Sequence, residues 1–259
     1  MTGVNKPKPK MIQSILAIPT SSKRITCSTC EMTYNPNIHE DKTLHNKHHT
    51  KFINGVPWNT SNDKDISVLE NFIIIDKTSA VRSTTGKLRS NRNSIKCSII
   101  TINKTNKKHI QKVDTVLAMV NQELNASQDS GQWKKSEFDK SKAFILIIEG
   151  KAVGLCTTDT IGSNQGRWMI HKSQTVVPKQ INKNVIIGIS RIWICNKWRQ
   201  HGLAMKLLQC ILKHSIYGVI LSKNQIAFSQ PSFSGGMLAK SFNGVVHKSG
   251  EMLLPVYIE

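Results

Sequence analysis

Four residues near the N-terminus have the types and the spacing of a zinc site. Cys27 and Cys30 have two residues between them, and after fourteen more residues His45 and His49 follow with three residues between them. Two thiolates and two imidazoles suit tetrahedral zinc, and four protein ligands leave no open position for a substrate. The segment 24–50 is therefore predicted to be a C2H2 zinc finger with one structural Zn²⁺. The alternative is surface cysteines beside a histidine-rich helix.

A second group of residues, in the C-terminal half, has the pattern of a phosphate site. An apolar β-branched segment ends at Cys195, the basic turn Arg199–Ala204 follows, and apolar residues then recur at helical spacing up to Ser215. A turn from strand to helix directs backbone N–H groups and the positive end of the helix dipole at one point, which favours an anion. Gly202 permits backbone angles that a side chain disfavours. The pattern predicts a binding site for a phosphorylated ligand.

The residues of this turn and its surroundings resemble a known enzyme family. Arg-x-x-Gly-x-Ala after a strand is similar to the pyrophosphate loop of the GCN5-related N-acetyltransferases, which bind coenzyme A there. Longer stretches resemble the sister-chromatid cohesion acetyltransferases, from about residue 142 to the C-terminus. These stretches are Gly188–Trp193, Ile216–Gly218, Ile226–Ser232, Ser234–Gly236 and Leu238–Ala239.

The resemblance implies an α+β or α/β fold, in which a mixed sheet is flanked by helices and preceded by a small zinc finger. It also implies acetyl-CoA as cosubstrate, with main-chain groups at the end of the long strand lining the pantetheine and the turn holding the pyrophosphate. The residues expected to bind the cofactor are Ile192, Trp193, Ile194, Arg199, Gln200, His201, Gly202, Leu203 and Ala204.

The base for such a reaction is harder to find in the sequence. A free lysine titrates about 3.4 pKa units above pH 7, so its deprotonation costs roughly 4–5 kcal/mol. Many cohesion acetyltransferases have carboxylates where this chain has Gln209 and Gln230, and no Asp or Glu occurs between Asp159 and Glu251. The polar cluster Ser229, Gln230 and Ser232 is predicted to line the lysine site. The alternatives for the base are solvent, an acid of the substrate, or one of the histidines His201, His214 and His247.

By resemblance, the substrate is the ATPase-head subunit of the cohesin complex, acetylated in the nucleus during DNA replication to establish sister-chromatid cohesion. Gln13–Leu16 resembles the start of the motif that docks on the replicative sliding clamp, although Pro19 and Thr20 replace its two aromatics. One rival reading is a catalytically idle zinc-finger module that binds chromatin or DNA. Another is a small-molecule acetyltransferase for cations such as polyamines, against which the absence of carboxylates argues.

The excess of basic residues indicates a partner that carries negative charge. Lys and Arg number 36 against 16 acidic residues, which gives a net charge of +20 and a pI near 9.9. Such a chain is attracted to polyanions, and DNA or chromatin proximity is expected. The apolar run Ile15–Ile18 is too short for a signal or a membrane span, so no membrane association is expected. The six cysteines show no disulfide framework, which is typical of a reducing compartment.

The elements that must position these residues follow from periodicity. Residues 1–23 are predicted to be a disordered basic tail, and 51–108 a basic linker with possible strands at Phe72–Ile75 and Ile99–Ile102. Between Lys77 and Lys112 lie ten basic residues and no acid, which suits contact with DNA or an acidic partner. The acetyltransferase domain is predicted over 109–259. Within it we expect helices over 113–124, 202–215 and 234–242, a hairpin over 143–155, and strands over 184–195, 226–229 and 253–257.

Overall fold

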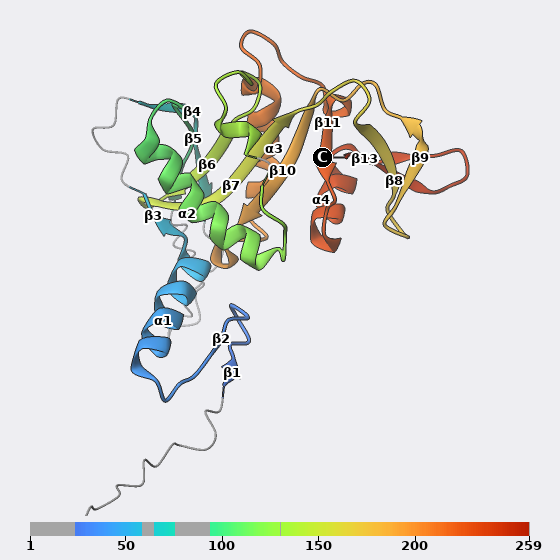
Figure 1. The fold of residues 1–259 in the computed structure, drawn as a ribbon. Coiled ribbons are helices and arrows are strands. Elements are labelled where there is room, and N and C mark those ends of the chain that lie inside the picture. Colours follow the sequence, from blue (N-terminus) through green and yellow to red (C-terminus); the bar gives the residue numbers. More distant parts are fainter. Residues whose placement is uncertain (1–23, 59–64, 76–93, 130, 259) are drawn as a thin grey trace, which may run out of the picture.

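The computed structural model of the protein describes residues 24–58, 65–75, 94–129 and 131–258. The predicted tail, the segment Gln13–Leu16 within it and much of the acid-free basic run lie outside the described residues. Figure 1 shows a large sheet with helices on both faces and a smaller N-terminal unit beneath it. The helices are α1 (His39–Asn54), α2 (Lys107–Glu123), α3 (Leu203–His214) and α4 (Phe233–Asn243).

Two short strands belong to the N-terminal unit, and the other strands form the large sheet. The N-terminal pair is β1 (Ile25–Thr26) and β2 (Thr33–Tyr34). The first half of the large sheet comprises β3 (Val56–Pro57), β4 (Ile66–Ile75), β5 (Ser94–Ile102), β6 (Ala143–Ile148) and β7 (Lys151–Thr160). Its second half comprises β8 (Gly166–Ile170), β9 (Thr175–Ile181), β10 (Ile187–Ile194), β11 (Ile226–Ser229), β12 (Val245–Val246) and β13 (Met252–Tyr257).

The sheet is mixed, as expected. Its strand order is β4-β5-β6-β7-β10-β11-β13-β8-β9, with β3 paired to β7 and β12 to β13. The pairs β10–β11 and β11–β13 are parallel, and the other pairs of this sheet are antiparallel. Segment 51–108 contributes β3, β4 and β5, so the sheet starts well before residue 109 in the chain.

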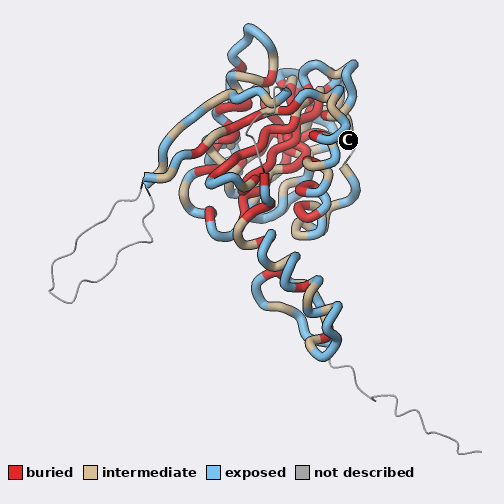
Figure 2. Tube along the Cα trace, turned by 90° about the vertical axis from the view of Figure 1, so that its left-hand side faces the viewer, coloured by how far each residue is buried: buried red, intermediate tan, exposed pale blue. Residues whose placement is uncertain are grey.

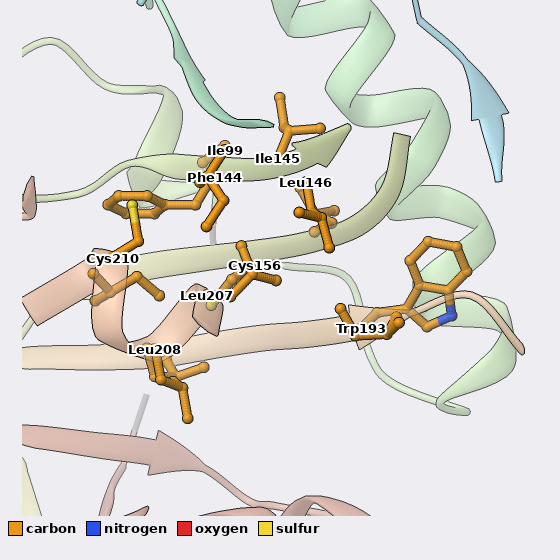
Figure 3. Packing of buried hydrophobic residues seen from close by; sticks show 14 of the residues in the cluster. Ile99, Phe144, Ile145, Leu146, Cys156, Trp193, Leu207, Leu208 and Cys210 are labelled. Carbon is orange, nitrogen blue, oxygen red and sulfur yellow. The ribbon is translucent and has the colours of Figure 1, made fainter. Parts of the chain in front are cut away.

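Helices cover the two faces of the sheet and bury its centre. Every residue of β6 is buried, which matches its continuous apolar sequence. Figure 2 shows this buried centre in red, with exposed segments around it. Figure 3 shows Cys156 of β7 near Leu207 and Cys210 of α3 in this core. Cys97, Cys156, Cys195 and Cys210 are all buried and free, in line with the absence of a disulfide framework in the sequence.

Most of the elements expected from periodicity are present with small shifts in their bounds. The hairpin is β6–β7, and the three helices are α2, α3 and α4. The hairpin β8–β9 was not predicted, because β9 is largely exposed and lacks the apolar alternation that marks a half-buried strand. Among the described residues, no helix is both long and apolar enough to cross a membrane.

Candidate active site and metal centre

The four predicted zinc ligands meet in the N-terminal unit. One ligand atom from each of Cys27, Cys30, His45 and His49 lies within 4.8 Å of the other three. The thiol Sγ of Cys27 is 3.4 Å from Nδ1 of His49. Helix α1 places the two histidines one turn apart on the same face, while the β1–β2 hairpin supplies the cysteines. The ring of Tyr34 stacks on His45 with 3.9 Å between ring centroids.

The chemistry of these donors fits Zn²⁺. His45 is 7% exposed, and neither of its ring nitrogens has a hydrogen-bond partner, so a ring nitrogen is available to bind a metal. Backbone N–H groups of Cys30 and Thr29 lower the pKa of Cys27 to about 6, which favours the thiolate that binds metal. Burial raises the pKa of Cys30, so this thiol would depend on the metal for its ionisation. The set is closed and structural.

The finger packs on the large sheet next to the predicted cofactor loop. Helix α1 packs against Asn196–Trp198, the short 3-10 turn directly before the predicted cofactor loop. Its C-terminal extension β3 pairs with β7 of the large sheet. Phe52 of α1 is buried at this junction. The finger is therefore fixed against the sheet.

The strands β10 and β11 separate halfway along their length. Their Cα partners run only from Ile187 to Ile189 on β10, although β10 continues to Ile194. An irregularity between Ile189 and Arg191 in the pairing with β7 coincides with this point. We call the region beyond the last pair, Ile189 with Phe228, the strand split. The predicted pantetheine-lining residues Ile192, Trp193 and Ile194 all lie along it, where main-chain groups of β10 have no partner on β11.

The predicted pyrophosphate loop lies at the end of the strand split. Gly202 has a φ of +73° and immediately precedes α3, and no side chain caps this helix start in the described structure. Gln200 also has positive φ, +65°, so the loop reverses tightly. A side chain at Gly202 would meet nothing within 4 Å, which leaves the helix N-terminus open to an anion. Leu203 is buried and anchors the helix, while Ala204 is half-buried beside it.

The side chain of Arg199 has a different role from contact with a phosphate. Its guanidinium forms an ion pair with Glu123 at the end of α2, and its Nε donates to the Ile194 carbonyl at 2.9 Å. Glu123 also accepts a hydrogen bond from the Trp193 indole. This network holds the loop, β10 and α2 together. Glu123 was missed in the sequence, because nothing in the spacing of α2 relates it to a residue 76 positions later.

The predicted lysine-site residues lie together just beyond β11. Ser229 ends β11 and is half-buried, and Gln230 is exposed with a φ of +23° that turns the chain out of the sheet. The hydroxyl of Ser232 accepts a hydrogen bond from the Gly235 N–H at 3.3 Å and so caps α4. Gln209 is exposed on α3. The cluster adjoins the strand split, and its assignment to the substrate lysine stays a prediction.

The candidate histidine bases are dispersed. His201 lies in the cofactor loop, where its Nδ1 is 2.8 Å from the Arg199 carbonyl oxygen. His214 is at the far end of α3, 3.8 Å from Glu70 of β4. His247 is in the turn after β12, with its Nδ1 2.9 Å from the Ser249 hydroxyl. His214 is thus at the opposite end of α3 from the cofactor loop, and His201 and His247 are hydrogen-bonded within their own turns.

Comparison with known proteins agrees with this geometry. A family model described as ESCO1/2 acetyl-transferase matches residues 183–250, and one described as the zinc-finger of acetyl-transferase ESCO matches 13–51. N-acetyltransferase ECO1 of Debaryomyces hansenii is 47% identical over 96% of this chain and 89% of that protein. The Saccharomyces cerevisiae protein of the same name is 33% identical over 97% of this chain and 96% of its own length.

A solved structure supports the fold. The xEco2 acetyltransferase domain bound to a K105-CoA conjugate matches with a TM-score of 0.53, covering 76% of this chain and 99% of that chain at 19% identity. The extent of the sequence identity shows that the chain belongs to the Eco1/ESCO family of N-acetyltransferases, and the Cys/His cluster at its N-terminus fits the structural zinc finger of that family.

Proposed function

We propose that this acetyltransferase modifies a lysine of the ATPase-head subunit of cohesin, in the nucleus and during DNA replication, and thereby establishes sister-chromatid cohesion. The observation that carries the proposal is the uncapped start of α3 at the strand split, in a chain 47% identical to an ECO1 N-acetyltransferase. An anion-binding loop beside separated strands is the machinery that acetyl transfer needs.

The charge of the molecule favours an acidic or DNA-associated substrate. The net charge is +20, and residues 160–250, which include the cofactor loop and the predicted lysine site, contain no carboxylate. A positive surface raises the local concentration of acidic protein segments and of chromatin, and it repels small cations such as polyamines. Charge therefore supports a protein substrate close to DNA.

The direct test is mass spectrometry of the purified ATPase-head subunit after incubation with this enzyme and acetyl-CoA. We expect acetylation of one or a few lysines of the subunit, and none with Gly202→Asp enzyme. Acetylation of the enzyme alone, with the cohesin subunit unmodified in the presence of its assembled complex and DNA, would contradict the proposed substrate.

Docking on the replicative sliding clamp through Gln13–Leu16 forms a second part of the proposal. It is tested by calorimetry with the purified clamp, comparing the full chain with a Gln13→Ala, Leu16→Ala variant. We expect weak binding that the double substitution abolishes. Equal binding by both proteins would assign clamp contact to another segment.

A further inference from the structure

A buried tyrosine–aspartate pair crosses the sheet next to the strand split. The phenol of Tyr257 on β13 donates a hydrogen bond to Oδ2 of Asp159 on β7 at 2.8 Å. Both residues are buried, Tyr257 at 3% and Asp159 at 2% exposure. The two strands are separated by β10 and β11, so the tyrosine ring has to lie across both intervening strands.

Small residues make this crossing possible. A Cβ at Gly188 of β10 would lie 2.5 Å from Cε1 of the Tyr257 ring, so no other residue fits there without displacing the ring. On β11, Ala227 belongs to the same small buried cluster as Tyr257, and Gly188 and Ala227 are direct partners. The tyrosine ring is therefore held over the pair Gly188–Ala227, which directly precedes Ile189–Phe228, the last pair of β10 and β11. One residue along a strand is about 3.3 Å, which places the ring next to the start of the strand split.

The register places this pair on the α2 face of the sheet, opposite α3 and α4. Asp159 is the partner of Gly188, and Tyr257 is the partner of Ser229 at the end of β11. Thr157, two residues from Asp159, is the partner of Arg191, whose Nε donates to Asn121 of α2. Phe228, in contrast, contacts Phe242 of α4 with 6.4 Å between ring centroids. The tyrosine–aspartate pair therefore lies on the α2 face, beside the start of the strand split.

We propose that Tyr257 and Asp159 form the proton acceptor that the sequence lacks at Gln209 and Gln230. This proposal rests on the proposed lysine acetyltransferase function. Tyr257 accepts a proton from the substrate ammonium, directly or through one water, and passes its own phenolic proton to the Asp159 carboxylate. Asp159 acts through the phenol: it positions the Tyr257 hydroxyl and holds the transferred proton.

The step balances in atoms and charge. One ammonium N–H bond breaks and one phenol O–H bond forms, while the former phenol O–H bond breaks and a carboxyl O–H bond forms. The neutral amine attacks the thioester carbonyl, the C–N bond forms, and the C–S bond breaks with departure of the coenzyme A thiolate. A second proton leaves the nitrogen and protonates that thiolate. Asp159 then returns its proton to solvent through Tyr257.

Two other carboxylates among the described residues lie near the strand split, and each makes its own contacts. Glu123 forms the ion pair with Arg199 and accepts from Trp193. Asp129 accepts from the Ser190 hydroxyl and from the Trp133 indole, each at 2.8 Å, one bond to each carboxylate oxygen. Asp129 is half-buried and next to the irregularity in β10, so it is the rival proton acceptor that a test has to separate from Asp159.

The experiment compares two acceptor peptides with Asp159→Asn, Tyr257→Phe and Asp129→Asn enzymes. One peptide contains the lysine that mass spectrometry identifies, and the other has S-(2-aminoethyl)cysteine in its place, whose amine is more acidic because sulfur withdraws electrons. With the lysine peptide, we expect kcat of Asp159→Asn and Tyr257→Phe enzymes to fall by about 100-fold or more, with acetyl-CoA affinity unchanged. With the S-(2-aminoethyl)cysteine peptide, the fold loss of kcat in these two variants should be at least threefold smaller than with the lysine peptide.

The outcomes separate a chemical role from a structural one. A packing defect lowers kcat equally for both peptides, and that result would overturn the proposal. The proposal would also be overturned if the loss of kcat became smaller with the more acidic amine only for the Asp129→Asn enzyme. Should Asp159→Asn not fold, Tyr257→Phe decides, since it keeps the ring over Gly188. Tyr217→Phe, at a fully exposed tyrosine, is the control and should match the unmodified enzyme. Failure of unmodified enzyme to acetylate any lysine would instead contradict the proposed function.

Discussion

The zinc finger and the strand split show two different ways in which a chain assembles a site. All four finger ligands lie within one short segment, on a hairpin and the helix that follows it. The strand split takes its residues from β7, β10, β11 and β13 and from the end of α2, which together extend from Glu123 to Tyr257 in the chain. Spacing along the chain reveals the first kind of site, because local elements convert spacing directly into geometry. The second kind depends on strand order, which spacing does not encode.

The largest effect is expected at the finger. Replacing Cys27 or His49 with Ala should remove zinc and unfold the region around α1, because structural zinc contributes on the order of 10 kcal/mol to such small units. Metal analysis should find one zinc per unmodified chain and none in the variants. Hydrogen exchange should show loss of protection over 24–54. Protein purified without chelator that contains no zinc would contradict the assignment.

Loss of zinc from the finger should also weaken cofactor binding at the loop. Helix α1 packs on Asn196–Trp198, so unfolding of the finger removes one support of the turn before Arg199. We expect a smaller effect there, a few-fold loss of acetyl-CoA affinity by calorimetry. Unchanged affinity in zinc-free protein would show that the sheet alone fixes the loop.

The next largest effect is expected from Gly202→Asp. It places a side chain at a φ of +73° and a carboxylate at the open start of α3, where the pyrophosphate is predicted to bind. Loss of one or two charge-assisted hydrogen bonds corresponds to about 100-fold weaker acetyl-CoA binding. Gly218→Asp is the matched control, since Gly218 has a φ of +71° in an open turn at the other end of α3. Equal affinities for the two variants would place the cofactor elsewhere.

Glu123→Gln should have an intermediate effect. It keeps the shape of the side chain but removes the charge that holds Arg199 and the Trp193 indole. We expect about tenfold weaker acetyl-CoA binding, because hydrogen bonds to a charged group contribute about 1.5–3 kcal/mol and Arg199 is partly exposed. Glu70→Gln, which breaks the ion pair with Lys213 at the opposite end of α3, is the control and should leave the affinity unchanged. A loss below twofold would show that the network is dispensable.

The sequence predicted the parts of the molecule whose signals are local. The finger ligands, the hairpin β6–β7 and the helix after the cofactor loop follow from spacing and periodicity within short segments, whereas the mixed sheet was expected from the family resemblance. Asp159 was visible only as the last acid before a long stretch without carboxylates. Its position beneath Tyr257 depends on the strand order β7-β10-β11-β13 and on the small residues Gly188 and Ala227. Glu123 was hidden for the same reason, because α2 and the cofactor loop meet only in the folded protein.

The smallest effect is expected from restoring acids at the two glutamines. If Tyr257 and Asp159 take the lysine proton, then Gln209→Glu and Gln230→Asp enzymes gain little. Gln209 is exposed on α3, and Gln230 is exposed where the chain leaves β11. We expect kcat within about threefold of the unmodified enzyme at pH 7.5, measured with the acceptor peptide. The rate of both variants should rise from about pH 7 to 9 as more of the amine becomes neutral. A much larger gain in kcat for Gln230→Asp, together with a flatter rise of the rate with pH, would contradict this expectation. It would show that a carboxylate just after β11 is the better base, and that the unmodified enzyme lacks an efficient base.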